Sequence, residues 1–131
     1  MQTVPYWCLV AAVALIYLPR QVITYLMIKQ PGGYDNELPR RAQAGLEGIG
    51  QRAVAAHLNA FEAFAPFAAG VLASIQRGVD REVVAWLAIA FVAARSIYLA
   101  CYLANWSLVR SIVWVIGLGL SSMLLFLAAI G

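Results

Sequence analysis

The sequence predicts an all-α integral membrane protein, a four-helix antiparallel bundle forming a single domain over residues 1–131. Hydrophobic residues make up 63% of the chain and charged residues 11%, whereas a soluble protein carries about 25% charged residues. Polar segments divide the apolar residues into four blocks, each long enough to cross a bilayer. Two of the three connections are short, which favours antiparallel neighbours. No soluble domain fits between the blocks, so the chemistry must lie in or beside the membrane.

The first helix is expected over residues 3–28. No Lys or Arg precedes Arg20, so the block does not have the cationic start of a secretory signal and we interpret it as a retained helix. Pro19 and Arg20 interrupt its apolar pattern. Either the helix kinks there, or Arg20 lies near a polar cavity or interface. We favour a kinked helix that continues to about residue 28.

The second helix is expected over residues 43–76, after a loop rich in turn residues and charges at 30–41. At 1.5 Å per residue this helix is longer than a hydrocarbon core of about 30 Å, so its first turns should project into water. Gly45, Gly48 and Gly50 make that projecting portion the least secure part of the helix.

The last two helices are expected over residues 82–104 and 107–130. Asp80 is a candidate N-cap for the first of them. Cys8 and Cys101 lie toward opposite faces of the membrane in this arrangement. A disulfide requires Cα atoms within about 7 Å, so the two thiols should remain unpaired.

A polar stripe runs along the second helix and is unusual for a membrane span. At 100° per residue, five positions fall within one sector, whereas His57 lies off it; they are Arg52, Ala55, Asn59, Glu62 and Pro66. Pro66 has no N–H to donate to the carbonyl of Glu62, which leaves an open acceptor beside the carboxylate. An ionisable residue inside a span indicates a functional site.

A second stripe lies on the third helix, where Arg95, Tyr98 and Tyr102 recur at i, i+3 and i+7. It can face the stripe of the second helix, with Arg110 and Ser111 opening the fourth helix nearby. Guanidinium groups suit carboxylates and phosphates, and Glu62 suits an ammonium group or one of the arginines. A small zwitterionic anion is therefore the natural ligand. A thiol beside Arg110 would ionise more easily, because a cation lowers its pKa, and Ser111 could donate a hydrogen bond to the sulfur.

The distribution of cations predicts the orientation in the membrane. The first and third connections lie on the same side of the membrane. If the arginines inside the spans are assigned to that half, it holds seven cations, namely Arg20, Lys29, Arg40, Arg41, Arg52, Arg95 and Arg110. The other half holds Arg77 and Arg81. The positive-inside rule then places the first and third connections in the cytoplasm and both termini outside. The net charge of +3 fits this orientation rather than nucleic-acid binding.

The segment from Arg52 to Phe67, with the pattern R-x4-H-x-N-x2-E-x3-P-F, strongly resembles the central helix of the MAPEG family, the membrane-associated proteins of eicosanoid and glutathione metabolism. The pattern from Arg95 to Tyr102 and the pair Arg110-Ser111 resemble its third helix and the start of its fourth. The chain is most similar to the bacterial-type microsomal glutathione transferases, which implies a bacterial inner membrane.

The resemblance implies a homotrimer with three glutathione sites at its subunit interfaces, open to the cytoplasm, and glutathione as co-substrate. Asn59 and Glu62 resemble the helix-two ligands, and Glu62 would hold the γ-glutamyl amino group. Arg110 resembles the arginine that stabilises the thiolate, with Ser111 beside it. The remaining expected glutathione ligands are Arg52, Arg95, Tyr98 and Tyr102. Tyr98 stands where the prostaglandin synthase branch has His. His57 matches a family histidine and is expected to support the site rather than bind glutathione.

Two positions depart from the family pattern. Ala55 stands where glutathione-using members carry an arginine, and Leu58 matches the transferase branch but not the prostaglandin synthase branch. A basic residue late in the first helix is also expected, and Lys29 or Arg20 can fill that place. Loss of one charge-assisted contact, about 1.5 to 3 kcal/mol, would weaken glutathione binding by one to two orders of magnitude.

The leading hypothesis is a membrane-bound glutathione transferase or peroxidase that acts without a metal on a lipophilic substrate, in contact with membrane lipids. The alternative is a non-catalytic protein of the same fold that serves as a partner subunit or lipid-binding module. Structural roles stay open for individual residues as well. Glu62 can pair with Arg52 or Arg95, Asn59 can bond across helices, His57 can be structural, and Arg110 can be a membrane anchor.

Overall fold

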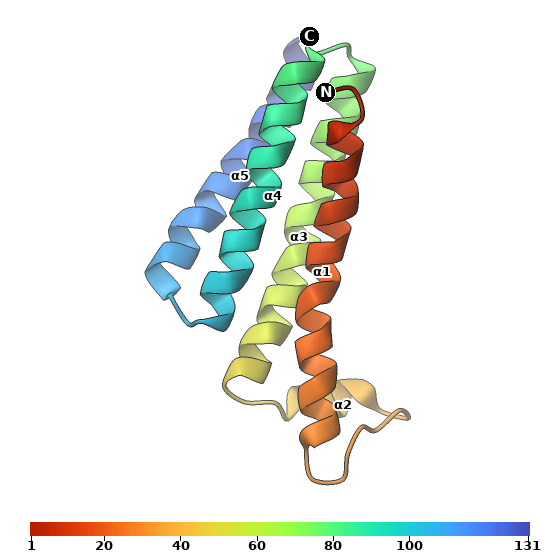
Figure 1. Ribbon diagram of the computed structural model, residues 1–131, viewed down its shortest axis with the longest axis vertical. Coiled ribbons are helices and arrows are strands. Elements are labelled where there is room, and N and C mark those ends of the chain that lie inside the picture. The colour runs from red at the N-terminus through yellow and green to blue at the C-terminus, as the bar shows by residue number, and fades with distance from the viewer.

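The computed structural model describes all 131 residues, and its regular elements are exclusively helices (Figure 1). They are α1 (Val4–Lys29), α2 (Pro39–Ala44), α3 (Ile49–Gln76), α4 (Arg81–Leu103) and α5 (Ser107–Ile130). The four long helices are each long and apolar enough to cross a membrane. The predicted all-α, four-span architecture is therefore confirmed.

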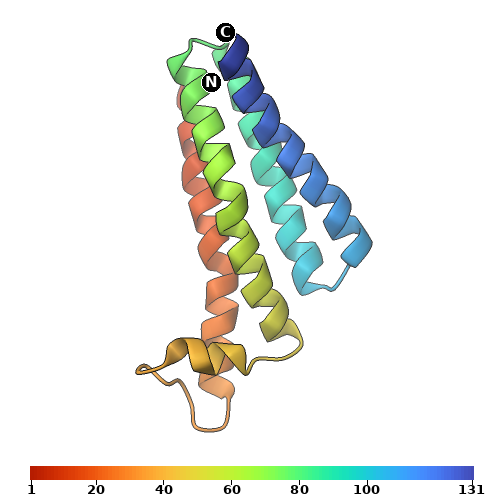
Figure 2. The same cartoon turned by 180° about the vertical axis from the view of Figure 1, so that it is seen from behind.

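The four long helices run antiparallel in sequence. Both termini and the α3–α4 turn lie at one end of the molecule, which we call the terminal end (Figure 1). The opposite end carries α2 and the α4–α5 turn, and we call it the α2 end. The α4–α5 hairpin diverges from α1 and α3 toward the α2 end, so the molecule has the shape of a V that is closed at the terminal end (Figure 2).

The closed part of the V is held by tight interhelical packing. Phe67 of α3 stacks on Phe91 of α4 with ring centroids 3.8 Å apart, and both side chains are buried. Ser74 on α3 donates a 2.8 Å hydrogen bond to the carbonyl of Leu124 on α5. A Cβ atom on Gly70 would lie 2.8 Å from the Cβ of Leu124. Only a glycine at position 70 permits α3 and α5 to approach this closely.

The expected helix over residues 43–76 is wrong at its start. The helix is divided, since α2 ends at Ala44 and α3 begins at Ile49. Gly48, the residue directly before α3, adopts φ of 55° and ψ of −121°, a conformation outside the helical region that glycine adopts without strain. The break turns α2 back against α1, where Gln43 accepts a 2.6 Å hydrogen bond from Nη1 of Arg20.

The first helix passes through Pro19 without ending and continues to Lys29. Arg20 is half-buried at a polar cavity formed with α2, which is the second of the two alternatives raised for this position. The predicted cap at Asp80 is confirmed, because its carboxylate accepts hydrogen bonds from the backbone N–H groups of Glu82 and Val83. Cys8 and Cys101 are both free.

Candidate functional site

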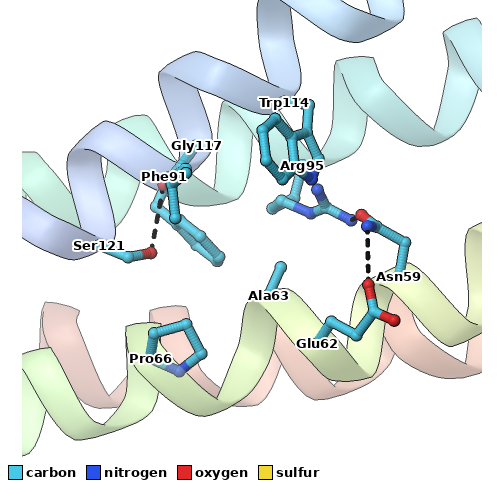
Figure 3. Close-up of a pocket in the computed structure, with 10 residues that line it drawn as sticks. Asn59, Glu62, Ala63, Pro66, Phe91, Arg95, Trp114, Gly117 and Ser121 are labelled. Carbon is cyan, nitrogen blue, oxygen red and sulfur yellow. Dashed lines mark hydrogen bonds between the residues drawn. The ribbon is translucent and has the colours of Figure 1, made fainter.

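A relay of hydrogen bonds joins α4 to α3 near the middle of the spans (Figure 3). Nη2 of Arg95 donates to Oδ1 of Asn59 over 2.9 Å. Nδ2 of Asn59 in turn donates to Oε2 of Glu62 over 3.1 Å. Arg95 is buried, so its charge needs compensation in the low-dielectric interior. The two stripes thus face one another, and Asn59 connects the guanidinium to the carboxylate.

An aromatic ladder extends this relay along α4 to α5. The guanidinium carbon of Arg95 lies 4.0 Å from the centroid of the Tyr98 ring. Tyr98 meets Tyr102 edge to face, with centroids 5.5 Å apart. The guanidinium carbon of Arg110 lies 4.4 Å from the centroid of the Tyr102 ring. The first two contacts join residues three and four apart on α4, and the third joins α4 to α5. A continuous chain of polar and aromatic contacts therefore runs from Glu62 to Arg110.

Arg52 and Ser111 lie outside this chain of contacts. Nη2 of Arg52 donates to the carbonyl of Leu103 over 3.3 Å, which binds Arg52 to the last turn of α4, where carbonyl groups lack helical partners. Nε of Arg52 is buried without a hydrogen-bond partner. The Ser111 hydroxyl donates to the carbonyl of Ser107 over 3.0 Å within its own helix. It would have to leave that bond before it could donate to a sulfur.

His57 faces α1 rather than the relay. Its Nδ1 lies 2.7 Å from the carbonyl oxygen of Ile16, and in the tautomer protonated at Nδ1 it donates a hydrogen bond there. Its ring packs edge to face on Phe61, with centroids 5.2 Å apart, and at 6.2 Å from Tyr17. The contacts of His57 tie α3 to α1.

Two cavities meet at Glu62. The first, which we call the α3–α5 slot, has a volume of about 90 Å³ and lies between α3, α4 and α5 (Figure 3). Its polar lining consists of Asn59, Glu62, Arg95 and Ser121. Its other lining residues are Ala63, Pro66, Phe91, Trp114, Gly117 and Leu118.

The second cavity, which we call the arginine cavity, has a volume of about 600 Å³ and lies between α1, α2 and α3. It is lined by Arg20, Pro39, Arg40, Gln43, His57, Leu58, Phe61 and Glu62. The sequence does not single out Arg40 and Gln43 as site residues, because Arg40 lies in the expected loop at 30–41 and Gln43 lies at the projecting start of the expected second helix. The two glycines at positions 45 and 48 were the feature of the sequence that could have indicated a break between α2 and α3, which lets α2 fold back.

The comparisons with known proteins identify one family. The model of the MAPEG family matches residues 4–130, which is nearly the whole chain. No curated protein and no solved structure matches the chain.

Proposed function

The chain belongs to the MAPEG family, and from this premise we propose that it is a membrane-bound, glutathione-dependent transferase or peroxidase that presents a glutathione thiolate to a lipophilic substrate. The observation that supports this most directly is the chain of contacts from Glu62 through Asn59 and Arg95 to Arg110. Charged groups inside a span are costly and are retained where they bind or move a polar ligand.

The chemistry of the two cavities fits glutathione, a zwitterion with one ammonium group and two carboxylates. Glu62 lines both cavities and offers its carboxylate to the ammonium group. Arg20 and Arg40 line the arginine cavity and offer guanidinium groups to the carboxylates. Its volume of about 600 Å³ lies in the range of small-molecule sites, about 300 to 1,000 Å³. In this proposal Asn59 and Arg95 orient Glu62, and Tyr98 and Tyr102 contact the tripeptide.

Arg110 is the proposed activating residue. A guanidinium beside a thiol lowers the thiol pKa from its ordinary value of about 8.5 and so raises the thiolate fraction at neutral pH. The thiolate sulfur then forms a bond to an electrophilic carbon, and the leaving group departs with its electron pair. In the peroxidase version a peroxide oxygen takes the place of that carbon. Ser111 lies next to Arg110 and would assist after its hydroxyl leaves Ser107.

A homotrimer with sites at its interfaces is part of the proposal. Glu62 is exposed in the single chain, although it lies within a span. A carboxylate exposed to lipid is strongly disfavoured, so a neighbouring subunit or a water-filled cavity between subunits should surround it. Arg110 and Tyr102 are only half-buried, which leaves them accessible to the same interface. The remaining apolar surface would contact membrane lipids.

The proposed orientation places the α2 end in the cytoplasm and both termini outside, in a bacterial inner membrane. The terminal end carries Arg77 and Arg81. The α2 end carries more cations around α2 and the end of α1, namely Arg20, Lys29, Arg40 and Arg41. This excess supports a cytoplasmic α2 end under the positive-inside rule.

The proposal is tested with purified protein by calorimetric titration with glutathione and by conjugation of an activated aryl halide. We expect Arg110→Ala to retain glutathione binding within about tenfold but to lower the conjugation rate by at least roughly a hundredfold, because the thiolate loses its charge partner. Arg77→Ala removes the same charge at the terminal end and should behave as the wild type.

The function is excluded if the wild-type protein neither binds glutathione nor conjugates the halide, and if Arg110→Ala is indistinguishable from it. That result would favour the alternative, a non-catalytic partner subunit or lipid-binding module. The observation behind the alternative is Ala55, which stands half-buried on α3 one turn before Asn59, where glutathione-using relatives carry an arginine. A stoichiometric membrane partner that co-purifies with the chain would support it.

A further inference from the structure

The α3–α5 slot has an apolar half for which the glutathione chemistry has no use. We propose that this half is a binding site for one small aromatic ring, and that Gly117 sets how deeply the ring enters. The binding site follows from the geometry of a single protomer. Only its use to hold an electrophilic substrate rests on the proposed function.

The slot exists because α3 and α5 are in contact near the terminal end and separate toward the α2 end. They touch at Gly70 and Leu124, where an added Cβ would lie 2.8 Å from the Cβ of Leu124. The hydrogen bond from Ser74 to the Leu124 carbonyl also holds α3 and α5 together at this position. The hairpin of α4 and α5 then diverges from α3 toward the α2 end (Figure 2), and the slot lies in this widening region.

The two ends of the slot differ in polarity. Asn59 and Glu62 lie at one end, and Pro66, Phe91 and Ser121 lie at the other (Figure 3). The Ser121 hydroxyl donates to the carbonyl of Gly117 over 3.2 Å, so the apolar end presents no free donor. A ligand there should have no polar group of its own.

The walls of the slot favour an aromatic ligand over an aliphatic one. Phe91 and Trp114 both line the slot, and aromatic pairs contribute about 0.5 to 1.5 kcal/mol beyond the area that they bury. Arg95 also lines the slot, but its guanidinium already contacts Asn59 and the Tyr98 ring, so the preference rests on the two aromatic walls. An alkyl chain would gain only the burial of its surface.

The volume of the slot limits the ligand to about one ring. Its 90 Å³ is less than the engineered cavity of roughly 150 Å³ that holds benzene, so the ring would be partly outside. Trp114 is 42% exposed and Leu118 48% exposed, so neighbouring side chains within the protomer do not enclose either of them. A Cβ on Gly117 would meet only Cδ of Arg95, at 3.7 Å. Larger side chains at position 117 can therefore fill the slot.

The experiment uses bromobenzene, an unactivated aryl halide that quenches indole fluorescence on contact, with the full-length protein in nanodiscs. Trp114 is made the only tryptophan by changing Trp7, Trp86 and Trp106 to Phe. Quenching should have a saturable component that weakens at least about tenfold in Gly117→Leu. The matched control is Gly119→Leu on the same helix, where an added Cβ meets nothing within 4 Å. It should leave the component unchanged. Gly117→Ala, as a smaller change, should be intermediate, and circular dichroism verifies folding.

The outcomes separate this inference from the proposed function. Quenching without a saturable component, or with equal effects of Gly117→Leu and Gly119→Leu, overturns the aromatic site whether or not glutathione binds. If phospholipid with a brominated acyl chain quenches Trp114 with the same dependence on residue 117, the slot holds a lipid chain and the inference is wrong. In an active enzyme, Gly117→Leu should raise the KM for an aryl halide about tenfold and leave the KM for glutathione unchanged.

Discussion

Asn59 is the residue on which the relay between α3 and α4 depends. Its Oδ1 accepts from Arg95 and its Nδ2 donates to Glu62, so the amide satisfies a cation and an anion at once. The two readings of Asn59, a bond across helices and a glutathione ligand, are not exclusive. Its second N–H and the remaining lone pair of its oxygen are still available to a ligand.

We predict that Asn59→Leu destabilises the protein by about 1 to 3 kcal/mol, because the buried guanidinium of Arg95 loses its acceptor. It should also weaken glutathione binding about tenfold or more, because Glu62 is no longer oriented. Unfolding in detergent and calorimetric titration measure the two effects.

Asn59→Asp keeps an acceptor for Arg95, so its free energy of unfolding should be closer to that of the wild type than the value for Asn59→Leu. The control is Ser96→Ala, since the hydroxyl of this exposed serine bonds only to Val92 of its own helix. An Asn59→Leu protein as stable as Ser96→Ala would show that the relay contributes nothing to folding.

The sequence predicted which residues share a face but not which atoms they contact. Helical periodicity predicted that the stripe with Asn59 and Glu62 can face the stripe with Arg95. In the structure Asn59 is hydrogen-bonded to both Glu62 and Arg95. Arg52 shares their sector, but its long side chain reaches Leu103 instead. Ser111 bonds to Ser107. Periodicity determines the direction of Cβ, whereas long or rotatable side chains end where the nearest open acceptor lies.

At the scale of the elements, hydropathy predicted the four spans, because each is long, apolar and bounded by polar turns. It did not predict that α2 and α3 are separate helices. Helix propensity penalises a glycine but does not say whether it breaks a helix. The contact that decides the matter is tertiary, since Leu46 is buried beside Ile23 and Met27 of α1 and the chain bends to bring it there.

We predict that Gly70→Ala lowers the stability of the bundle by about 1 to 3 kcal/mol, because the added methyl group forces α3 and α5 apart. Thermal unfolding followed by circular dichroism measures the loss. The same substitution at Gly119 meets nothing within 4 Å and removes a helix-disfavouring residue, so Gly119→Ala should be neutral or stabilising. Equal effects at both positions would contradict the close approach at Gly70.

At the scale of the whole molecule, the antiparallel bundle followed from short connections, but the V shape did not. Hydropathy and loop length say that helices are neighbours and leave their separation undetermined. The separation depends on pairs such as Gly70 with Leu124, where close approach is possible, and on the distance at which Arg95 can reach Asn59. Residues 70 and 124 are too far apart in sequence for any local pattern to pair them.

We predict that native mass spectrometry of the protein released from detergent shows a homotrimer with up to three bound glutathione molecules. The reason is the exposed carboxylate of Glu62 within a span, which a second subunit would cover. Glu62→Leu should reduce glutathione occupancy, and Arg81→Leu, which removes an exposed charge at the terminal end, should not. A wild-type monomer that binds glutathione would contradict the interfacial site.

The divergence of the two helix pairs has a mechanical consequence in a bilayer. A protomer that is narrow at the terminal end and wide at the α2 end displaces more lipid area in one leaflet than in the other (Figure 2). Any further separation of α3 and α5 expands that area and does work against the lateral pressure of the leaflet. We therefore expect the width of the α3–α5 slot to depend on lipid packing, and bilayers of different spontaneous curvature to favour different degrees of opening.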